Sequence, residues 1–142
     1  MVMSKIFWDT NLFIYLFEEN PEYCQIVTQL REKMIARGDQ LLTSTMTLGE
    51  VQVKPRRVGR PDEAALYKAT LLQVASVIPF DAKAADAYSI IREGTNIKGA
   101  DAIQLACAST VEVELFITND TQLHKLSIPG IHFITSVERA PI

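Results

Sequence analysis

The sequence lacks several features that would mark a membrane, fibrous or disordered protein. Its apolar stretches fall far short of the roughly 20 residues that a membrane-spanning helix needs, and Asp9 interrupts the N-terminal stretch before an apolar signal-peptide region can form. Glycine and proline are scarce, at 6 each in 142 residues, which excludes collagen-like and low-complexity chains. We therefore expect a cytoplasmic protein without a membrane segment.

Cysteine and histidine are also rare, with 2 of each. Cys24 and Cys107 stand in no metal-ligand or redox spacing, and each falls in an apolar helical pattern, so we expect buried free thiols. His124 and His132 have no nearby Ser, Cys or second His that would complete a zinc or nucleophilic site. A phosphate-binding glycine loop, a nucleophile elbow and a dinucleotide fingerprint are all missing.

The charge balance is close to neutral. The chain has 14 basic and 17 acidic residues, a net charge of −3, which argues against a protein that holds nucleic acid by bulk positive charge. A nuclease stays open, because clustered carboxylates lower the net charge and the cations they bind are not counted. With 142 residues, 48% of them hydrophobic, we expect one domain over residues 1–142.

Apolar runs that suit buried strands alternate with segments of helical spacing. The expected strands are 5–8, 40–43, 77–80, 114–118 and 131–134. The expected helices are 12–17, 21–37, 62–73, 82–93 and 100–108, with a further helix opening at the capping-box pattern of Thr47 to Glu50. Parallel strands need crossover connections, and helices supply them. The pattern predicts the α/β class, a three-layer α/β/α sandwich around a mainly parallel sheet.

Four acidic residues are expected at one edge of this sheet. Ligands of such sheets gather at the carboxyl ends of the strands, and Asp9 and Asp120 follow two expected strands. Glu50 lies in the first turns after the second strand, and Asp101 opens the helix that starts near Gly99. Each acid alone has an ordinary explanation as a turn residue, a capping residue or a first-turn acid.

Taken together, the four carboxylates indicate a metal site. Converging negative charges repel one another unless cations lie between them. Ligands that are all oxygen favour a hard ion such as Mg²⁺ or Mn²⁺. One or two such ions are a common device for hydrolysing phosphodiesters, so the pattern indicates nuclease chemistry.

The acids lie in motifs that resemble those of PIN-domain ribonucleases, in the same order along the chain. The motifs are Ile6-Phe7-Trp8-Asp9-Thr10-Asn11, Thr47-Leu48-Gly49-Glu50-Val51, Asp101-Ala102-Ile103-Gln104-Leu105-Ala106 and Thr118-Asn119-Asp120. The small single-domain members are mostly VapC-like toxins of type II toxin–antitoxin systems. The resemblance implies a metal-dependent endoribonuclease that a cognate antitoxin protein holds inactive. It also implies a homodimer, with the helices over 22–36 and 62–73 as contact surfaces.

The resemblance carries roles over to single residues. Asp9, Glu50, Asp101 and Asp120 match the catalytic, metal-binding acids, and Asn11 and Thr118 match polar positions that orient them. We expect Mg²⁺ or Mn²⁺ to be held by Asp9 and Asp101, with Glu50 and Asp120 completing the cluster directly or through water. The ion lowers the pKa of a bound water, which attacks the scissile phosphate in line.

A basic run follows Glu50. The segment from 54 to 61 has no apolar periodicity and is predicted to be a loop. Its basic residues are Lys54, Arg56, Arg57 and Arg60. They either contact RNA phosphates beside the acidic edge or belong to an ordinary solvated loop, and a salt titration of RNA binding separates these two interpretations.

Two other functions fit parts of the pattern. A receiver-like signalling domain also places acids and a Thr at strand ends and binds Mg²⁺. It requires adjacent acids after the first strand and a phosphorylated Asp after the third, whereas Asp81 is expected to cap a helix. A non-catalytic RNA-binding or partner-binding module of the same fold would be favoured by a missing acid, and all four are present.

Overall fold

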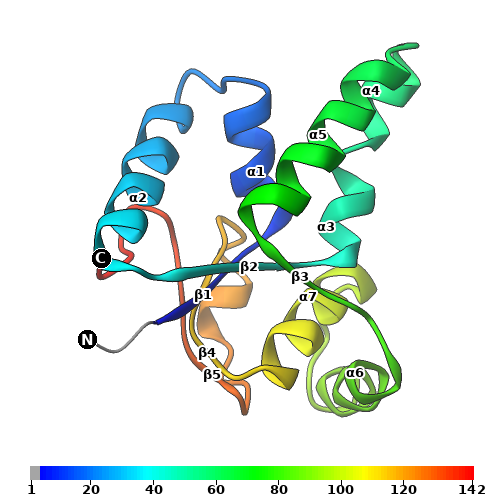
Figure 1. Ribbon diagram of the computed structural model, residues 1–142. Helices are drawn as coiled ribbons and strands as arrows, with labels where there is room; N and C mark the ends of the chain where they lie inside the picture. The colour runs from blue at the N-terminus through cyan, green and yellow to red at the C-terminus, as the bar shows by residue number, and fades with distance from the viewer. Residues whose placement is uncertain (1–3) are drawn as a thin grey trace.

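The first strand lies at the centre of a parallel sheet. In the computed structural model, which describes residues 4–142, β1 (Lys5–Trp8) pairs with β2 (Gln40–Ser44) on one side and with β4 (Val113–Ile117) on the other. The edge strands are β3 (Ser76–Ile78) and β5 (Ile131–Thr135), and the order is β3-β2-β1-β4-β5 (Figure 1). All the paired strands are parallel, which confirms the predicted α/β class.

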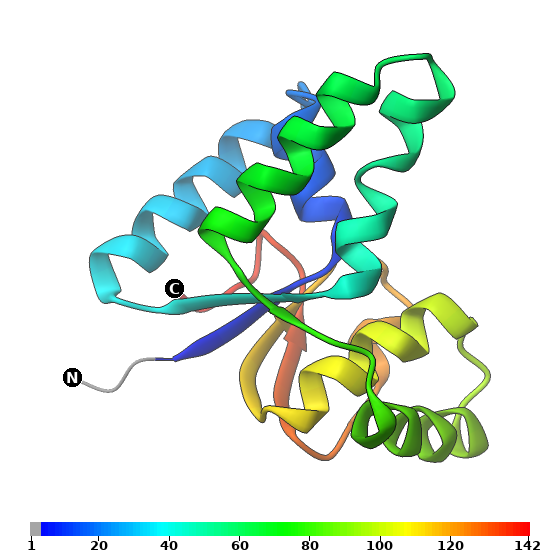
Figure 2. The same cartoon turned by 45° about the vertical axis from the view of Figure 1, so that its right-hand side comes forward.

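Helices cover both faces of the sheet (Figure 2). One face carries α1 (Thr10–Phe17), α2 (Cys24–Arg37) and α5 (Pro61–Val74), and the other carries α6 (Ala82–Gly94) and α7 (Gly99–Thr110). The short helices α3 (Thr45–Glu50) and α4 (Val53–Arg57) connect β2 to α5, and the 3-10 turn η1 (Leu123–Lys125) follows β4. The arrangement is the predicted three-layer sandwich.

Alternate strand residues point to opposite faces and build two hydrophobic cores. Phe7 and Phe116 face α6 and α7, and their rings stack with centroids 4.9 Å apart. Ile6 and Trp8 face α1 and α2, where Trp8 is 1% exposed. The central strands are apolar on both sides because helices cover both faces.

Two local predictions on the path from β2 to α5 are wrong. The basic run is not a loop throughout, because α4 forms over Val53–Arg57. Pro55 is tolerated there because it lies in the first turn, where a backbone N–H has no partner within the helix. Nor does α3 open at Thr47. Its N-cap is Ser44, whose hydroxyl accepts a hydrogen bond from the N–H of Met46 at 3.1 Å.

The other differences concern the ends of elements and one thiol. The helix α5 begins at Pro61, one residue before the predicted start, so Asp62 lies in its first turn. Cys107 is buried as expected, whereas Cys24, at the start of α2, is only half-buried. Within residues 4–142, no helix is long and apolar enough to cross a membrane.

Candidate active site

The carboxyl ends of β1 and β4 adjoin where the sheet divides. The chain passes from β1 to β2 and β3 on one side and returns to β4 and β5 on the other. Parallel sheets bind ligands at such a switch point. An acidic cleft of about 280 Å³ opens here, lined by Asp9, Thr10, Asn11, Ile14, Glu50, Ala100, Asp101, Gln104 and Asp120. All four acids that the sequence singles out therefore line one cleft.

Asp9 is held by three hydrogen bonds. It is 7% exposed and caps α1, with Oδ1 accepting from the backbone N–H of Thr10 at 2.8 Å. The same oxygen accepts from Nε2 of Gln104 at 3.0 Å, and Oδ2 accepts from the hydroxyl of Thr118 at 2.7 Å. These bonds fix the carboxylate and leave Oδ2 with lone-pair capacity for a further ligand.

Glu50 is the last residue of α3 and contacts the start of α1. The hydroxyl of Thr10 donates to Oε1 of Glu50 at 2.6 Å, and Thr10 Oγ1 lies 3.0 Å from Oγ1 of Thr47. Glu50 follows Thr47 by three residues, so both side chains lie on the same face of the short helix. These contacts bring Glu50 into the acidic cleft beside Asp9.

A buried glutamine connects these groups. Gln104 of α7 is 2% exposed, and its Nε2 lies 2.8 Å from Oγ1 of Thr47, 3.0 Å from Oδ1 of Asp9 and 3.1 Å from Oγ1 of Thr10. Its Oε1 accepts a hydrogen bond from the hydroxyl of Ser44. Gln104 thus joins α1, α3, α7 and the end of β2 beneath the acidic cleft.

Asp101 and Asp120 form the other side of the cleft. Asp101 lies in the first turn of α7, and burial, together with the negative charges of Asp120 and Asp9, raises the pKa of its carboxyl to about 6. Asp120 lies after β4, where its Oδ1 accepts from the N–H of Gln122 at 3.0 Å. It makes this turn ahead of η1, whose N-cap is Gln122.

The loop that carries Asp120 is held by two other residues. Thr118 is fully buried, and its Oγ1 accepts from the N–H of Asp120 at 3.1 Å while donating to Asp9. Nε2 of His124 lies 2.7 Å from the carbonyl oxygen of Thr118. The sequence motifs pointed to Thr118. They gave His124 no role, because the partner of the His124 ring is a backbone carbonyl, which no pattern of side chains records.

No sequence pattern singles out Gln104 either. A polar residue inside an apolar helix is an ordinary occurrence, and its hydrogen-bond partners come from three other elements. One signal could have found it. Gln104 follows Asp101 by three residues, so the two share a face of α7.

The family model for the PIN domain matches residues 6–129. The chain belongs to the PIN-domain family. VapBC2 from Rickettsia felis, bound to a promoter DNA fragment, is similar in structure (TM-score 0.71, 18% identity, 93% of this chain and 98% of that one). A toxin–antitoxin complex from Klebsiella pneumoniae gives a TM-score of 0.67 at 25% identity, over 89% and 94% of the chains. Mycobacterium tuberculosis VapC20, a sarcin-ricin loop cleaving toxin, gives 0.65 at 17% identity, over 86% and 96%. Among curated proteins, no sequence matches.

The donors in the cleft of this PIN domain fit a hard divalent cation. Carboxylate, amide and hydroxyl groups line it without sulfur or imidazole. Oδ1 of Asn11 is buried and has no hydrogen-bond partner among residues 4–142, so it is free to accept one from a ligand or its water. Across the same residues, no group of three or more His, Cys, Asp or Glu side chains is arranged to hold an ion by itself. A bound ion would therefore take part of its shell from water, as Mg²⁺ commonly does.

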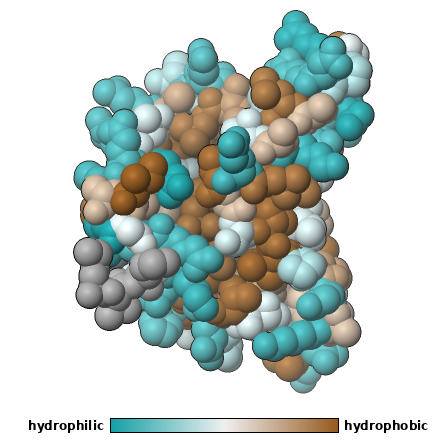
Figure 3. Space-filling model, in the orientation of Figure 1, coloured by the Kyte–Doolittle hydropathy of each residue, from teal (hydrophilic) through white to brown (hydrophobic). Residues whose placement is uncertain are grey.

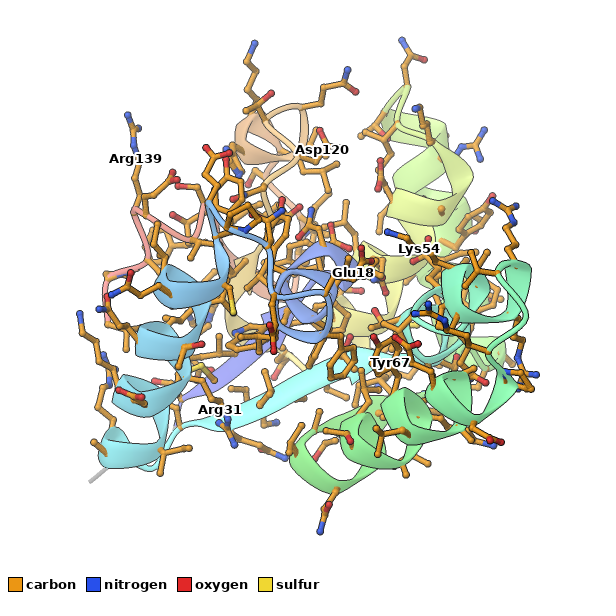
Figure 4. All side chains as sticks on the ribbon, turned by 90° about the horizontal axis from the view of Figure 1, so that it is seen from above. Glu18, Arg31, Lys54, Tyr67, Asp120 and Arg139 are labelled. Atoms are coloured by element: carbon orange, nitrogen blue, oxygen red, sulfur yellow. The ribbon has the colours of Figure 1, made fainter. Side chains whose placement is uncertain are left out.

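The basic run lies next to the acidic cleft, on α4 and the turn after it. Nζ of Lys54 lies 2.6 Å from Oε1 of Glu18, and Nη1 of Arg60 lies 3.5 Å from Oε2 of Glu63. Figure 4 shows Glu18 and Lys54 next to each other, with Asp120 farther away. Two of the four predicted phosphate contacts are thus already paired with carboxylates.

Proposed function

We propose that this PIN domain is a metal-dependent endoribonuclease that hydrolyses RNA phosphodiester bonds and acts as the toxin of a toxin–antitoxin pair. The observation that carries the proposal is the meeting of Asp9, Glu50, Asp101 and Asp120, from four parts of the chain, in one cleft. Burial, followed by repulsion from the carboxylates of Asp120 and Asp9, raises the pKa of Asp101. Such repulsion destabilises a fold unless a cation offsets it, and it is typical of functional sites.

The four acids and the residues that position them have distinct roles in the proposed reaction. A Mg²⁺ or Mn²⁺ ion, when bound, supplies a Lewis acid that makes water nucleophilic and stabilises negative charge on the phosphate. Asp9 and Asp101 would hold the ion, and Glu50 and Asp120 would contribute directly or through water. Gln104 and Thr118 orient the carboxylate of Asp9 by donating to its two oxygens.

Water is the nucleophile that this lining favours. Within the described chain the cleft is lined by no Cys, His or Lys side chain, and its hydroxyl group, that of Thr10, donates to Glu50. The hydroxyl of Thr10 thus has a carboxylate beside it instead of the His or Lys base that usually activates such a nucleophile. We infer direct, in-line hydrolysis without a covalent enzyme intermediate.

The first test compares acid-to-amide variants. Purified protein is incubated with a mixed RNA pool, with and without Mg²⁺ or Mn²⁺, as wild type, Asp9→Asn, Asp101→Asn and Asp62→Asn. Asp62 is an exposed acid on α5 outside the cleft and serves as the charge-matched control. We expect the first two variants to lose cleavage by about 10²-fold or more, with unchanged circular dichroism, because Asn can still cap α1. Full cleavage by both would overturn the assignment.

The proposed partner is a cognate antitoxin protein. Support comes from the solved relatives, which include a VapBC complex and a toxin–antitoxin complex at 25% identity. We expect expression of the chain alone to arrest cell growth, and co-expression of a neighbouring small gene to relieve the arrest. Growth that continues with active protein present would remove the toxin role while leaving the nuclease intact.

We also propose that the chain forms a homodimer through α5. Leu66 and Leu72 of this helix are 62% and 51% exposed, and Figure 3 shows apolar side chains gathered over α5 and below it. Exposed apolar patches of this kind mark interaction surfaces. Sedimentation of the isolated chain tests this, and a monomer at micromolar concentration would contradict it.

A further inference from the structure

The acidic cleft continues into a groove beside it. A second hollow shares Thr10, Ile14 and Glu50 with the cleft and extends between α1 and α4, where Glu18 and Lys54 line its sides. We call this second hollow the side groove. Arg57 lines it on the α4 side. A third hollow, which reaches α5, shares Glu18 and Lys54 with the side groove, so the Glu18–Lys54 ion pair lies where the two hollows meet.

The structure separates the four basic residues of the run by what they contact. Arg60 is paired with Glu63, and Lys54 with Glu18. Nη2 of Arg56 donates to Oε1 of Gln52 at 3.1 Å, and Arg56 lines neither the cleft nor the side groove.

Arg57 differs from its three basic neighbours. Its side chain is exposed and forms no salt bridge or side-chain hydrogen bond with any other residue between 4 and 142. An unpaired guanidinium on the wall of the side groove, next to Glu50, is suited to an anion that extends out of the cleft.

An RNA strand supplies anions at that position. Each nucleotide carries a phosphate, so a strand with one phosphate in the acidic cleft places its neighbours just outside it. The carboxylates of the cleft repel these phosphates, and cations beside the cleft offset the repulsion. In the side groove, the cation of Arg57 lies on a wall that also carries Thr10, Ile14 and Glu50 of the cleft.

We propose that the side groove binds the backbone phosphates of RNA that flank the cleaved bond, with Arg57 as the open contact and Lys54 as a second contact that Glu18 masks. This inference rests on the proposed ribonuclease function. A phosphate that replaces the carboxylate of Glu18 at Nζ of Lys54 opens the passage between the side groove and the third hollow. The ion pair thus acts as a latch on the path of the strand.

The latch is weak enough to open. The side chains of Lys54 and Glu18 are 72% and 35% exposed, and an ion pair this exposed contributes little to stability. A backbone phosphate offers Lys54 the same single negative charge and two anionic oxygens, as the carboxylate does. RNA binding can therefore break the pair at little cost, and removal of Glu18 should help it.

The test measures binding apart from cleavage. A labelled single-stranded RNA of mixed sequence is titrated with protein in the Asp9→Asn background, so that it stays intact, and anisotropy is read at several salt concentrations with Mg²⁺. The variants are Arg57→Gln, Arg56→Gln, Glu18→Gln, Lys54→Met and the Glu18→Gln/Lys54→Met pair. Arg56→Gln is the matched control, since it removes the same charge one residue away and off the groove.

We expect Arg57→Gln to weaken binding about fivefold or more and to reduce the salt slope by about 0.7, the value for one lost phosphate contact on a single strand. Arg56→Gln should weaken it less than about twofold. Glu18→Gln should tighten binding, and Lys54→Met should abolish that gain. In cleavage by the otherwise wild-type chain, Arg57→Gln should raise KM more than it lowers kcat.

Three results would overturn the inference. Equal losses of RNA affinity in Arg56→Gln and Arg57→Gln would mean that binding depends on net charge and not on the position of Arg57. If Glu18→Gln tightens RNA binding equally with Lys54 present and in the Lys54→Met background, the Glu18–Lys54 pair is not a latch. An acidic peptide that shows the Arg57 dependence while RNA does not would assign the groove to a protein partner. If the wild-type chain does not cleave RNA in the acid-variant test above, or if both acid variants cleave it fully, the proposed function fails. If cleavage stands and only these comparisons fail, the side groove alone is rejected.

Discussion

Replacing Gln104 with methionine tests whether one buried amide holds the acidic cleft together. Methionine has nearly the same length and volume as glutamine and removes both the amide hydrogens and the carbonyl oxygen. At 2% exposure, Gln104 has no access to water that could compensate for the loss. The change therefore isolates its hydrogen bonds to Asp9, Thr10, Thr47 and Ser44.

The size of the expected stability loss depends on which partners of Gln104 keep other hydrogen bonds. Asp9 still accepts from Thr10 and Thr118, and the hydroxyl of Thr10 still donates to Glu50. Ser44, which is fully buried, loses the acceptor for its hydroxyl, and an unsatisfied buried donor costs about 1–3 kcal/mol. The lost bond to the charged Asp9 adds about 1.5 kcal/mol. We expect the free energy of unfolding to fall by about 2.5–4.5 kcal/mol.

The assay is urea unfolding followed by the fluorescence of Trp8, the single tryptophan, which is buried. Gln73→Met, on the exposed side of α5, is the control and should change the free energy by less than about 0.5 kcal/mol. A double-mutant cycle with Ser44→Ala should give a coupling of about 1 kcal/mol. Cleavage should also fall about 10–100-fold, because Asp9 loses a positioning contact. A fall in the free energy of unfolding no larger than that of Gln73→Met would refute this account of the cleft.

The remaining predictions concern a charge and a glycine. In the fold, the pKa of Asp101 is raised from 3.8 to about 6, so its ionisation removes stability as the pH rises through that window. Without divalent cations, Asp101→Asn should therefore melt at a higher temperature than wild type at about pH 7.5, and the difference should shrink toward about pH 4; calorimetry in chelator checks this, and a gap that does not vary with pH would contradict it. Gly130 has φ +91°, and a Cβ there would lie 2.5 Å from the carbonyl oxygen of Ser109, whereas Gly59, with φ +74°, has open space around it. Alanine at Gly130 should lower the free energy of unfolding by about 2 kcal/mol more than alanine at Gly59, and equal urea midpoints for the two variants would show that the close approach is unimportant.

The fold could be predicted because its signals are local. Short apolar runs such as Lys5–Trp8 appear in the sequence as strands that are buried on both faces. One exception is α4. A helix of five residues in which only Pro55 is buried has no apolar periodicity to detect, and its charged residues therefore resembled a loop.

The site could be predicted only in part, for a different reason. Asp9 and Asp120 follow strands, and the rule that carboxyl ends of parallel strands share an edge places them together without any knowledge of packing. The partners of Gln104 are set by how α7 packs against β2 and α3, a tertiary arrangement that no local pattern records. Whether Arg56 or Arg57 lines the side groove likewise depends on which side of α4 faces α1.

The central position of β1 also determines when activity can appear during synthesis. The N–H of Asp9 donates to the carbonyl of Ile117 at 3.0 Å, and the hydroxyl of Thr118 reaches a carboxylate 109 residues earlier in the chain. A ribosome must therefore make residues through Asp120 before the cleft exists, which takes roughly 6–25 s at about 5–20 residues per second. For the proposed ribonuclease, the nascent polypeptide therefore cannot cleave the messenger from which it is translated before that point, and premature termination before that residue yields a product without the cleft.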